Sequence, residues 1–97
     1  MRERDIEKWL RHQIESMGGL AFKFTSPGND GVPDRLAVLP GGTIYFIELK
    51  TDRGRLSPLQ VWQRDRLRQL GVNVAVIKGM DEAAEFIEEV SEWKSEK

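Results

Sequence analysis

A β-hairpin predicted within residues 31–50 constrains the fold of this chain more than any other feature. Two apolar runs rich in β-branched residues, 35–39 and 43–49, flank the turn sequence Pro40-Gly41-Gly42. Apolar runs on either side of a glycine turn are typical of two antiparallel strands joined tightly. A turn centred on its middle glycine sets the register of the two strands. It pairs Asp34 with Glu48, Leu36 with Phe46, and Val38 with Ile44.

The open end of this hairpin is predicted to carry charge. Side chains alternate along a strand with period two, so Glu48 and Lys50 share a face with Ile44 and Phe46. Two carboxylates about 5 Å apart across a strand pair repel each other unless a cation lies between them. Hard divalent cations such as Mg²⁺ bind such oxygens at roughly 2.0–2.1 Å. The pairing of Asp34 with Glu48 therefore predicts a divalent-metal site, and the alternative is that Asp34 only caps a turn.

The spacing of these residues resembles a known nuclease signature. Pro33-Asp34 followed by Glu48-Leu49-Lys50 resembles the P-D…(D/E)-x-K motif of the restriction-endonuclease-like nuclease superfamily. The flanking segments 23–28, 31–35 and 56–60 are similar to those of the stand-alone VRR-NUC domains of phages and bacteria. The similarity extends over almost the whole chain. This combination is much more specific than the short motif alone.

The resemblance implies a nuclease that uses Mg²⁺, for which Mn²⁺ can substitute. The implied metal ligands are Asp34, Glu48, Glu7 and a backbone carbonyl of Ile47 or Leu49. In this superfamily the first helix commonly offers a glutamate to the metal. Glu7 lies at the edge of the apolar stripe of the first predicted helix, and Glu3, one turn earlier, is the alternative.

Further site residues are implied by the same resemblance. Lys50 would orient or deprotonate the attacking water or hold the phosphate, and Gln60 would support Lys50 or the water. Gln60 has a competing explanation, because Ser57, Pro58 and Gln60 together form the pattern of a helix start. The predicted DNA contacts are Lys23, Ser26, Arg35, Arg53 and Arg55. The turn-rich segment around Ser26 has the alternative of being only a turn.

Hydrophobic periodicity predicts the remaining elements. Helices are predicted over residues 2–17, 57–70 and 82–93, and strands over residues 20–24 and 72–77. The second helix is expected to bury Leu59, Trp62, Leu67 and Leu70, and Asp81 is expected to cap the third. The apolar run 72–77 predicts a strand inside the sheet. This order predicts an α/β fold with a mixed sheet, and the resemblance implies the restriction-endonuclease-like αβββαβ core with an added C-terminal helix.

Composition narrows the class of protein. The 97 residues are enough for a single small domain, 1–97, and 39% hydrophobic with 32% charged residues is ordinary for a soluble globular protein. No apolar run is long enough for a membrane span, and the N-terminus lacks the apolar centre of a signal peptide. The absence of cysteine fits a reducing cytoplasm, that of a bacterial or phage-infected host cell. With one histidine, a zinc site is not expected.

These features predict a metal-dependent, structure-selective DNA endonuclease. The basic segment 50–78 suits a phosphate backbone, although solvated helix faces would also explain it. A chain this small has little surface for reading a long base sequence, and two symmetric cuts require two active sites. The resemblance points to homodimeric nucleases that resolve four-way (Holliday) junctions, with Trp62 and Trp93 as candidate interface residues. The alternatives are a flap or general DNA nuclease, a non-catalytic nucleic-acid-binding module of the same fold, and a metal-dependent phosphoesterase acting on nucleotides.

Overall fold

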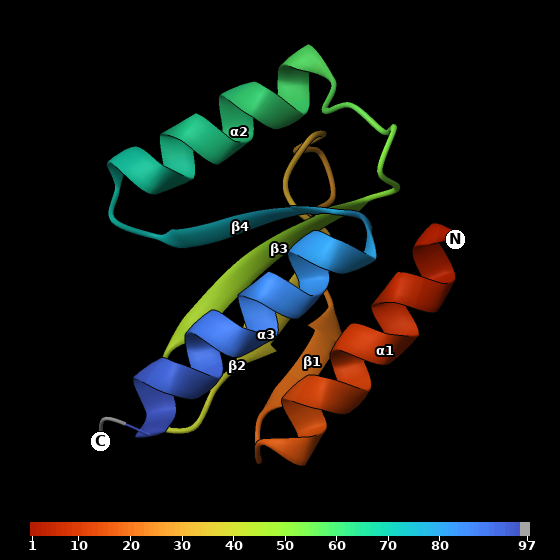
Figure 1. The fold of residues 1–97 in the computed structure, drawn as a ribbon. Coiled ribbons are helices and arrows are strands. Elements are labelled where there is room, and N and C mark those ends of the chain that lie inside the picture. Colours follow the sequence, from red (N-terminus) through yellow and green to blue (C-terminus); the bar gives the residue numbers. More distant parts are fainter. Residues whose placement is uncertain (96–97) are drawn as a thin grey trace.

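The computed structural model describes the backbone of residues 1–95 and the side chains of residues 1–91. These residues form three helices and four strands (Figure 1). Their order is α1 (Glu3–Ser16), β1 (Leu20–Lys23), β2 (Arg35–Val38), β3 (Ile44–Lys50), α2 (Pro58–Gln69), β4 (Asn73–Lys78) and α3 (Gly79–Ser95). The predicted α/β fold is confirmed. None of the described helices has the length and apolar character needed to cross a membrane.

The four strands form one mixed sheet in the order β1-β2-β3-β4. The first three strands are antiparallel neighbours, and β4 runs parallel to β3. A parallel pair needs a crossover connection, which α2 provides. Helices α1 and α3 lie side by side over the sheet, and α2 lies along β4 at the sheet edge (Figure 1).

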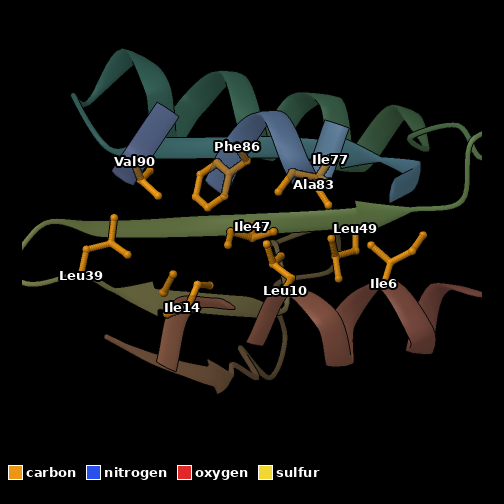
Figure 2. Packing of buried hydrophobic residues seen from close by; sticks show 11 residues of the cluster. Ile6, Leu10, Ile14, Leu39, Ile47, Leu49, Ile77, Ala83, Phe86 and Val90 are labelled. Carbon is orange, nitrogen blue, oxygen red and sulfur yellow. The ribbon is translucent and has the colours of Figure 1, made fainter. Parts of the chain in front are cut away.

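The core lies between the sheet and the pair α1 and α3. The helices contribute Ile6, Leu10, Ile14, Ala83, Phe86 and Val90, and the sheet contributes Ala37, Leu39, Ile47, Leu49 and Ile77 (Figure 2). The rings of Tyr45 and Phe86 meet edge to face with their centroids 5.2 Å apart. The apolar stripe of α1 recurs every four residues, so one face of this helix is buried while its charged residues remain outside. On the side of the sheet, the odd-numbered residues of β3 face this core.

The hairpin has the predicted register. Leu36 pairs with Phe46, and Val38 pairs with Ile44. The turn requires glycine, since Gly41 and Gly42 have φ angles of 90° and 88°, a region that residues with a Cβ rarely adopt. Asp34 precedes β2, and its carbonyl accepts a hydrogen bond of 2.7 Å from the backbone N–H of Phe24. The even-numbered residues of β3 point away from α1 and α3.

Two expectations about the last strand and the last helix were wrong. β4 is an edge strand and not an inner one, because the parallel crossover from β3 ends the described sheet there. Both α3 and α2 contact this strand. α3 begins at Gly79, where φ is 78°, so Asp81 lies in the first turn and is not the cap. The backbone N–H of Lys78 instead donates to Glu82 Oε1 over 2.8 Å.

The apolar residues of α2 are also less buried than expected. Leu59, Trp62 and Leu70 expose 43%, 51% and 78% of their surface, and the one buried side chain of this described helix is that of Gln63. The physical reason is the position of α2, which lies along the last strand and has no wide apolar surface to pack against. Arg68 donates from Nη2 to the carbonyl of Val74 over 2.7 Å at the same edge.

Candidate active site

Glu48 is the centre of the candidate site. Its side chain points to the sheet face away from α1, yet only 8% of its surface is exposed. Burial, and secondly the carboxylate of Asp34, raise the pKa of Glu48 to about 7. Lys50 lowers this pKa, Glu3 raises it and Arg35 lowers it. The open end of the hairpin therefore brings together the charges that the sequence predicted around Glu48.

The donor set fits a hard divalent cation of the magnesium type. The part of the chain that the structure describes contains no group of three or more histidine, cysteine or acidic side chains able to hold a metal. Two acids, Asp34 and Glu48, nevertheless lie close enough for the charge of Asp34 to raise the pKa of Glu48 further, in addition to burial. Mg²⁺ commonly takes one or two carboxylates and keeps several waters, so a larger protein cage is not required. A cation at this position would relieve the repulsion between the two acids.

Of the two glutamates of the first helix, Glu3 and not Glu7 contributes to the pKa shift of Glu48. Glu7 accepts a hydrogen bond of 3.3 Å from Arg11 Nε and lies in a hollow beside β1 and β2. Glu3 is exposed at the start of α1, and its charge contributes to the raised pKa of Glu48. The two glutamates are one turn apart on nearly the same helix face, so the tilt of α1 decides which of them reaches the hairpin.

Gln60 joins the start of α2 to the site. Its Oε1 accepts from the backbone N–H of Ser57 over 2.9 Å, and its own backbone N–H donates to Ser57 Oγ over 3.1 Å. The other end of the same amide, Nε2, donates to Glu48 Oε2 over 3.4 Å. The helix-cap and site roles were expected to compete for this side chain. They coexist because an amide carries an acceptor and a donor at opposite ends.

The loop before Asp34 is held against α2. Gln63 donates from Nε2 to the carbonyl of Asp30 over 3.2 Å. Gly31 has a φ of 86°, and a Cβ at this position would lie 2.7 Å from the carbonyl oxygen of Leu59. Only glycine permits both this backbone conformation and this approach. The first turn of α2 thus supports both the loop that leads to Asp34 and the carboxylate of Glu48.

The predicted DNA contacts do not form one group. Lys23 and Arg35 are direct partners across β1 and β2 and lie on the face of α1, opposite the face of Glu48. Ser26 Oγ accepts a hydrogen bond of 3.1 Å from Asn29 Nδ2 within its own turn. Arg53 and Arg55 are exposed in the loop after β3. This loop folds back over Lys50, because a Cβ on Gly54 would lie 3.0 Å from the Cβ of Lys50.

A second surface on the side of Glu48 was not expected from the sequence. The strand registers place six apolar side chains in two adjacent rows, which we call the outer sheet face: Leu20, Val38 and Ile44, then Phe22, Leu36 and Phe46. Leu20, Phe22 and Ile44 expose 52%, 50% and 48% of their surface. The alternating pattern of residues 20–24 could have indicated this surface. Of the interface candidates, Trp62 lies under Arg66, whose guanidinium is 4.4 Å from the ring centroid, and the side chain of Trp93 falls outside the described residues.

Comparison with solved structures defines the class of this fold. A structure named "VRR_NUC domain" superposes with a TM-score of 0.83 and is 33% identical over 89% of this chain and 94% of its own. A second, named "VRR_NUC domain protein", has a TM-score of 0.70 at 16% identity over 92% of this chain and 87% of its own, which shows the fold alone. No family model matches the sequence.

A curated relative makes the assignment more particular. "Putative nuclease p44" of Acyrthosiphon pisum secondary endosymbiont phage 1 is 44% identical over 81 residues, which cover 84% of this chain and 87% of the relative. The chain belongs to the VRR-NUC family.

Proposed function

We propose that this chain is a divalent-metal-dependent DNA nuclease, that residues 1–97 form one nuclease domain, and that the open end of the hairpin is its active site. The observation that most supports this active site is the buried carboxyl of Glu48, whose pKa is raised to about 7 by burial and by Asp34. An acid held in this state is costly in a protein that only needs to fold, and such perturbed groups are typical of functional sites. The phage relative that is named a nuclease supports the same proposal.

The proposed metal-binding residues are Asp34, Glu48, the carbonyl of Leu49 and, from the first helix, Glu3 in place of Glu7. When bound there, Mg²⁺ or Mn²⁺ would lower the pKa of a coordinated water and neutralise charge on the phosphoryl oxygens. Glu48 must lose its proton for this binding, since a carboxylate coordinates in its ionised form. When both are ionised, Asp34 and Glu48 repel each other, and both attract a cation placed between them.

The other residues of the site would bind and orient the substrate. Lys50 follows Glu48 on the same face and would hold the phosphate that is cut or orient the attacking water. Gln60 would fix the orientation of the Glu48 carboxylate through the bond from its Nε2. Arg53 and Arg55 lie in the loop that packs over Lys50. They would contact the DNA backbone on the exposed side of this loop.

Cleavage of supercoiled plasmid tests the proposed activity. We expect cutting with Mg²⁺ or Mn²⁺ and none in EDTA, and we expect Glu48→Gln to abolish cutting while DNA binding persists. Glu88→Gln is the matched control, because Glu88 is an exposed acid of α3 that is distant in the sequence from the hairpin. Cutting that persists in EDTA would reject the proposal. Binding by the wild type without cutting under every metal condition would favour a non-catalytic binding module.

We further propose a homodimer that cuts branched DNA, with four-way junctions preferred. The outer sheet face supports this, because monomeric proteins rarely leave a contiguous apolar surface of this kind exposed. A second copy is the occupant that fits: the six side chains of this face carry no charge, and a twofold axis would place apolar residues against apolar residues. The phage source of the relative supports action in the cytoplasm of an infected cell.

Sedimentation and competition experiments test this second proposal. We expect a dimer for the wild type and a monomer for Phe22→Glu, whereas Leu70→Glu remains dimeric, because Leu70, at the C-terminal end of α2, is 78% exposed and lies off the outer sheet face. Competition among a four-way junction, a 5′ flap and a plain duplex at one stated salt concentration measures the preference. A wild-type monomer that prefers flaps would reject this proposal and leave the nuclease proposal intact.

A further inference from the structure

A basic hollow lies between α1 and the strands β1 and β2. Its volume is about 340 Å³, and it is lined by Glu7, Arg11, Ala21, Phe22, Lys23 and Arg35. The hollow faces the side of α1, whereas Glu48 and Lys50 point to the other face of the sheet. Arg35 directly follows Asp34, and its charge lowers the pKa of Glu48. The hollow is therefore separate from the proposed active site but close to the same end of the strands.

Two cations in this hollow form no ion pair with a described residue. Lys23 and Arg35 are direct cross-strand partners, and like charges in this position repel each other. The ion pairs found among the described residues include neither of them. The acid in the hollow, Glu7, is already paired with Arg11 at 3.3 Å, and Arg11 also lies 3.8 Å from Glu15. Lys23 and Arg35 thus repel each other as two positive charges, just as Asp34 and Glu48 do as two negative charges.

The guanidinium of Arg35 carries a further sign of a missing partner. Its Nε is buried and has no hydrogen-bond partner among the residues that the structure describes. Buried donors are almost always satisfied in folded proteins. A void of about 10 Å³ behind Arg35, lined also by Leu10 and Ile47, is at the lower limit for one water molecule. A water there would satisfy Nε but would leave the two positive charges unbalanced.

We propose that the basic hollow binds a phosphate group of DNA other than the phosphate that is cut. This rests on the proposed nuclease function, which brings a polyanion to the same end of the sheet. A phosphate supplies several acceptor oxygens and a negative charge, which match the planar guanidinium of Arg35 and the ammonium of Lys23. A strand that crosses the end of β2 would place one phosphate at Glu48 and Lys50 and another in the hollow. The second contact would fix the position of the strand relative to the active site.

Nuclear magnetic resonance of the metal-free protein tests phosphate binding without any catalysis. The Nε–H resonance of Arg35 is followed while inorganic phosphate is added in EDTA, with chloride at equal ionic strength as the reference. We expect a saturable shift that is absent with chloride and is lost in Lys23→Gln. Lys23 is exposed, so this variant is expected to fold, and its thermal melting is measured as a check.

Binding of uncut DNA in EDTA tests the same site on the polymer. Arg35→Gln and Lys23→Gln should each weaken binding about tenfold at low salt and reduce the slope of log affinity against log salt by roughly 0.9. Lys8→Gln is the control, because Lys8 is an exposed cation of α1 outside the hollow. Arg35→Lys keeps the charge but not the guanidinium, so it should restore the salt slope and only part of the affinity.

The choice of DNA distinguishes two sources of the phosphate. If the variants lose equal affinity for a closed circular DNA and for a linear duplex, the hollow binds an internal phosphodiester. A loss confined to duplexes with 5′-phosphate ends assigns it to a terminal phosphomonoester. An unchanged salt slope in both variants, with no shift of the Arg35 resonance, would overturn the proposal. Because none of these measurements requires cleavage, failure of the nuclease proposal would appear separately in the plasmid experiment.

Discussion

Gln60 Nε2 donates a hydrogen bond to Glu48 Oε2 over 3.4 Å, although the two residues belong to different elements of the crossover. The same side chain completes the capping box of α2 with Ser57. The stability of the start of a helix and the orientation of a proposed catalytic carboxylate therefore depend on one amide. Substitutions that keep one end of this amide and change the other can separate the two roles.

The first prediction concerns Gln60→Glu and Ser57→Ala. A carboxylate at residue 60 keeps the acceptor for the Ser57 N–H but replaces the donor to Glu48 by a negative charge. We expect Gln60→Glu to retain most of the helix stability and to lose roughly 10- to 100-fold in cleavage rate, the loss that corresponds to a hydrogen bond to a charged group. Ser57→Ala should show the reverse, with about 1 kcal/mol of lost stability and a smaller effect on rate. Urea unfolding and plasmid cleavage of both variants check this, and equal losses of rate would contradict it.

The second prediction concerns the pH dependence of stability without metal. The folded-state pKa of Glu48, about 7, lies above its ordinary value of 4.5. The neutral carboxyl therefore contributes stability that is fully present below about pH 4.5 and is lost as the pH rises through 7. The loss is on the order of 3 kcal/mol. Urea unfolding in EDTA at pH 5 and pH 8 should show this loss in the wild type and in Glu88→Gln, and a much smaller one in Glu48→Gln. Parallel pH profiles for all three proteins would contradict the assignment.

The third prediction concerns Asp34→Asn. Removing this negative charge should lower the pKa of Glu48 toward its ordinary value and leave the metal-free melting temperature unchanged or raised. Added Mg²⁺ should raise the melting temperature of the wild type but not of the variant, and cleavage should be lost in the variant. Thermal melts with and without Mg²⁺ measure both effects. A marked drop in metal-free stability would show instead that Asp34 is a structural turn cap.

The fourth prediction compares two glycines of the loop before Asp34. Gly28 and Gly31 have φ angles of 80° and 86°, but a Cβ on Gly28 would meet no atom within 4 Å, whereas one on Gly31 would lie 2.7 Å from the carbonyl oxygen of Leu59. Gly28→Ala should cost about 1 kcal/mol, the penalty of the backbone conformation alone, with activity retained. Gly31→Ala should cost more and reduce cleavage, since it displaces the turn of α2 that carries Gln60. Denaturant unfolding and cleavage of the pair measure the difference, and equal effects would remove the proposed link between loop and helix.

The sequence predicted those features that depend on local pattern. The alternation of residues 35–49 was enough to give the register of the hairpin, and with it the common face of Glu48 and Lys50. The apolar stripe predicted for the first helix corresponds to Ile6, Leu10 and Ile14, which the structure buries. The nuclease-type motif then identified Asp34, Glu48 and Lys50 as the candidate site residues of this hairpin. In these cases a short stretch of chain already determines which side chains lie together.

The features that were missed depend on how elements meet in space. The choice between Glu3 and Glu7, which the sequence left open, depends in the same way on how α1 packs; Glu7 is paired with Arg11. The amphipathic pattern of α2 could not reveal that its position along β4 leaves Leu59 and Trp62 about half exposed. The alternation of residues 20–24 indicates two faces of β1, but the outer sheet face also required the pairing of β1 with β2. Hydrophobic periodicity identifies which residues share one face of a helix or strand, but it does not show which other element packs against that face.

The weak attachment of α2 affects how the protein would lose activity. Gln63 is the buried residue of this helix, and its described anchors are polar: the bonds to Asp30, Glu48 and Val74. Segments with few buried apolar contacts open at lower free energy than the rest of a structure, so α2 should detach while the core between α1, α3 and the sheet remains folded. Such local opening separates Gln60 from Glu48. Heat inactivation would then begin below the melting temperature of the sheet and reverse on cooling, and one loosely held helix would set the upper temperature at which the site is intact.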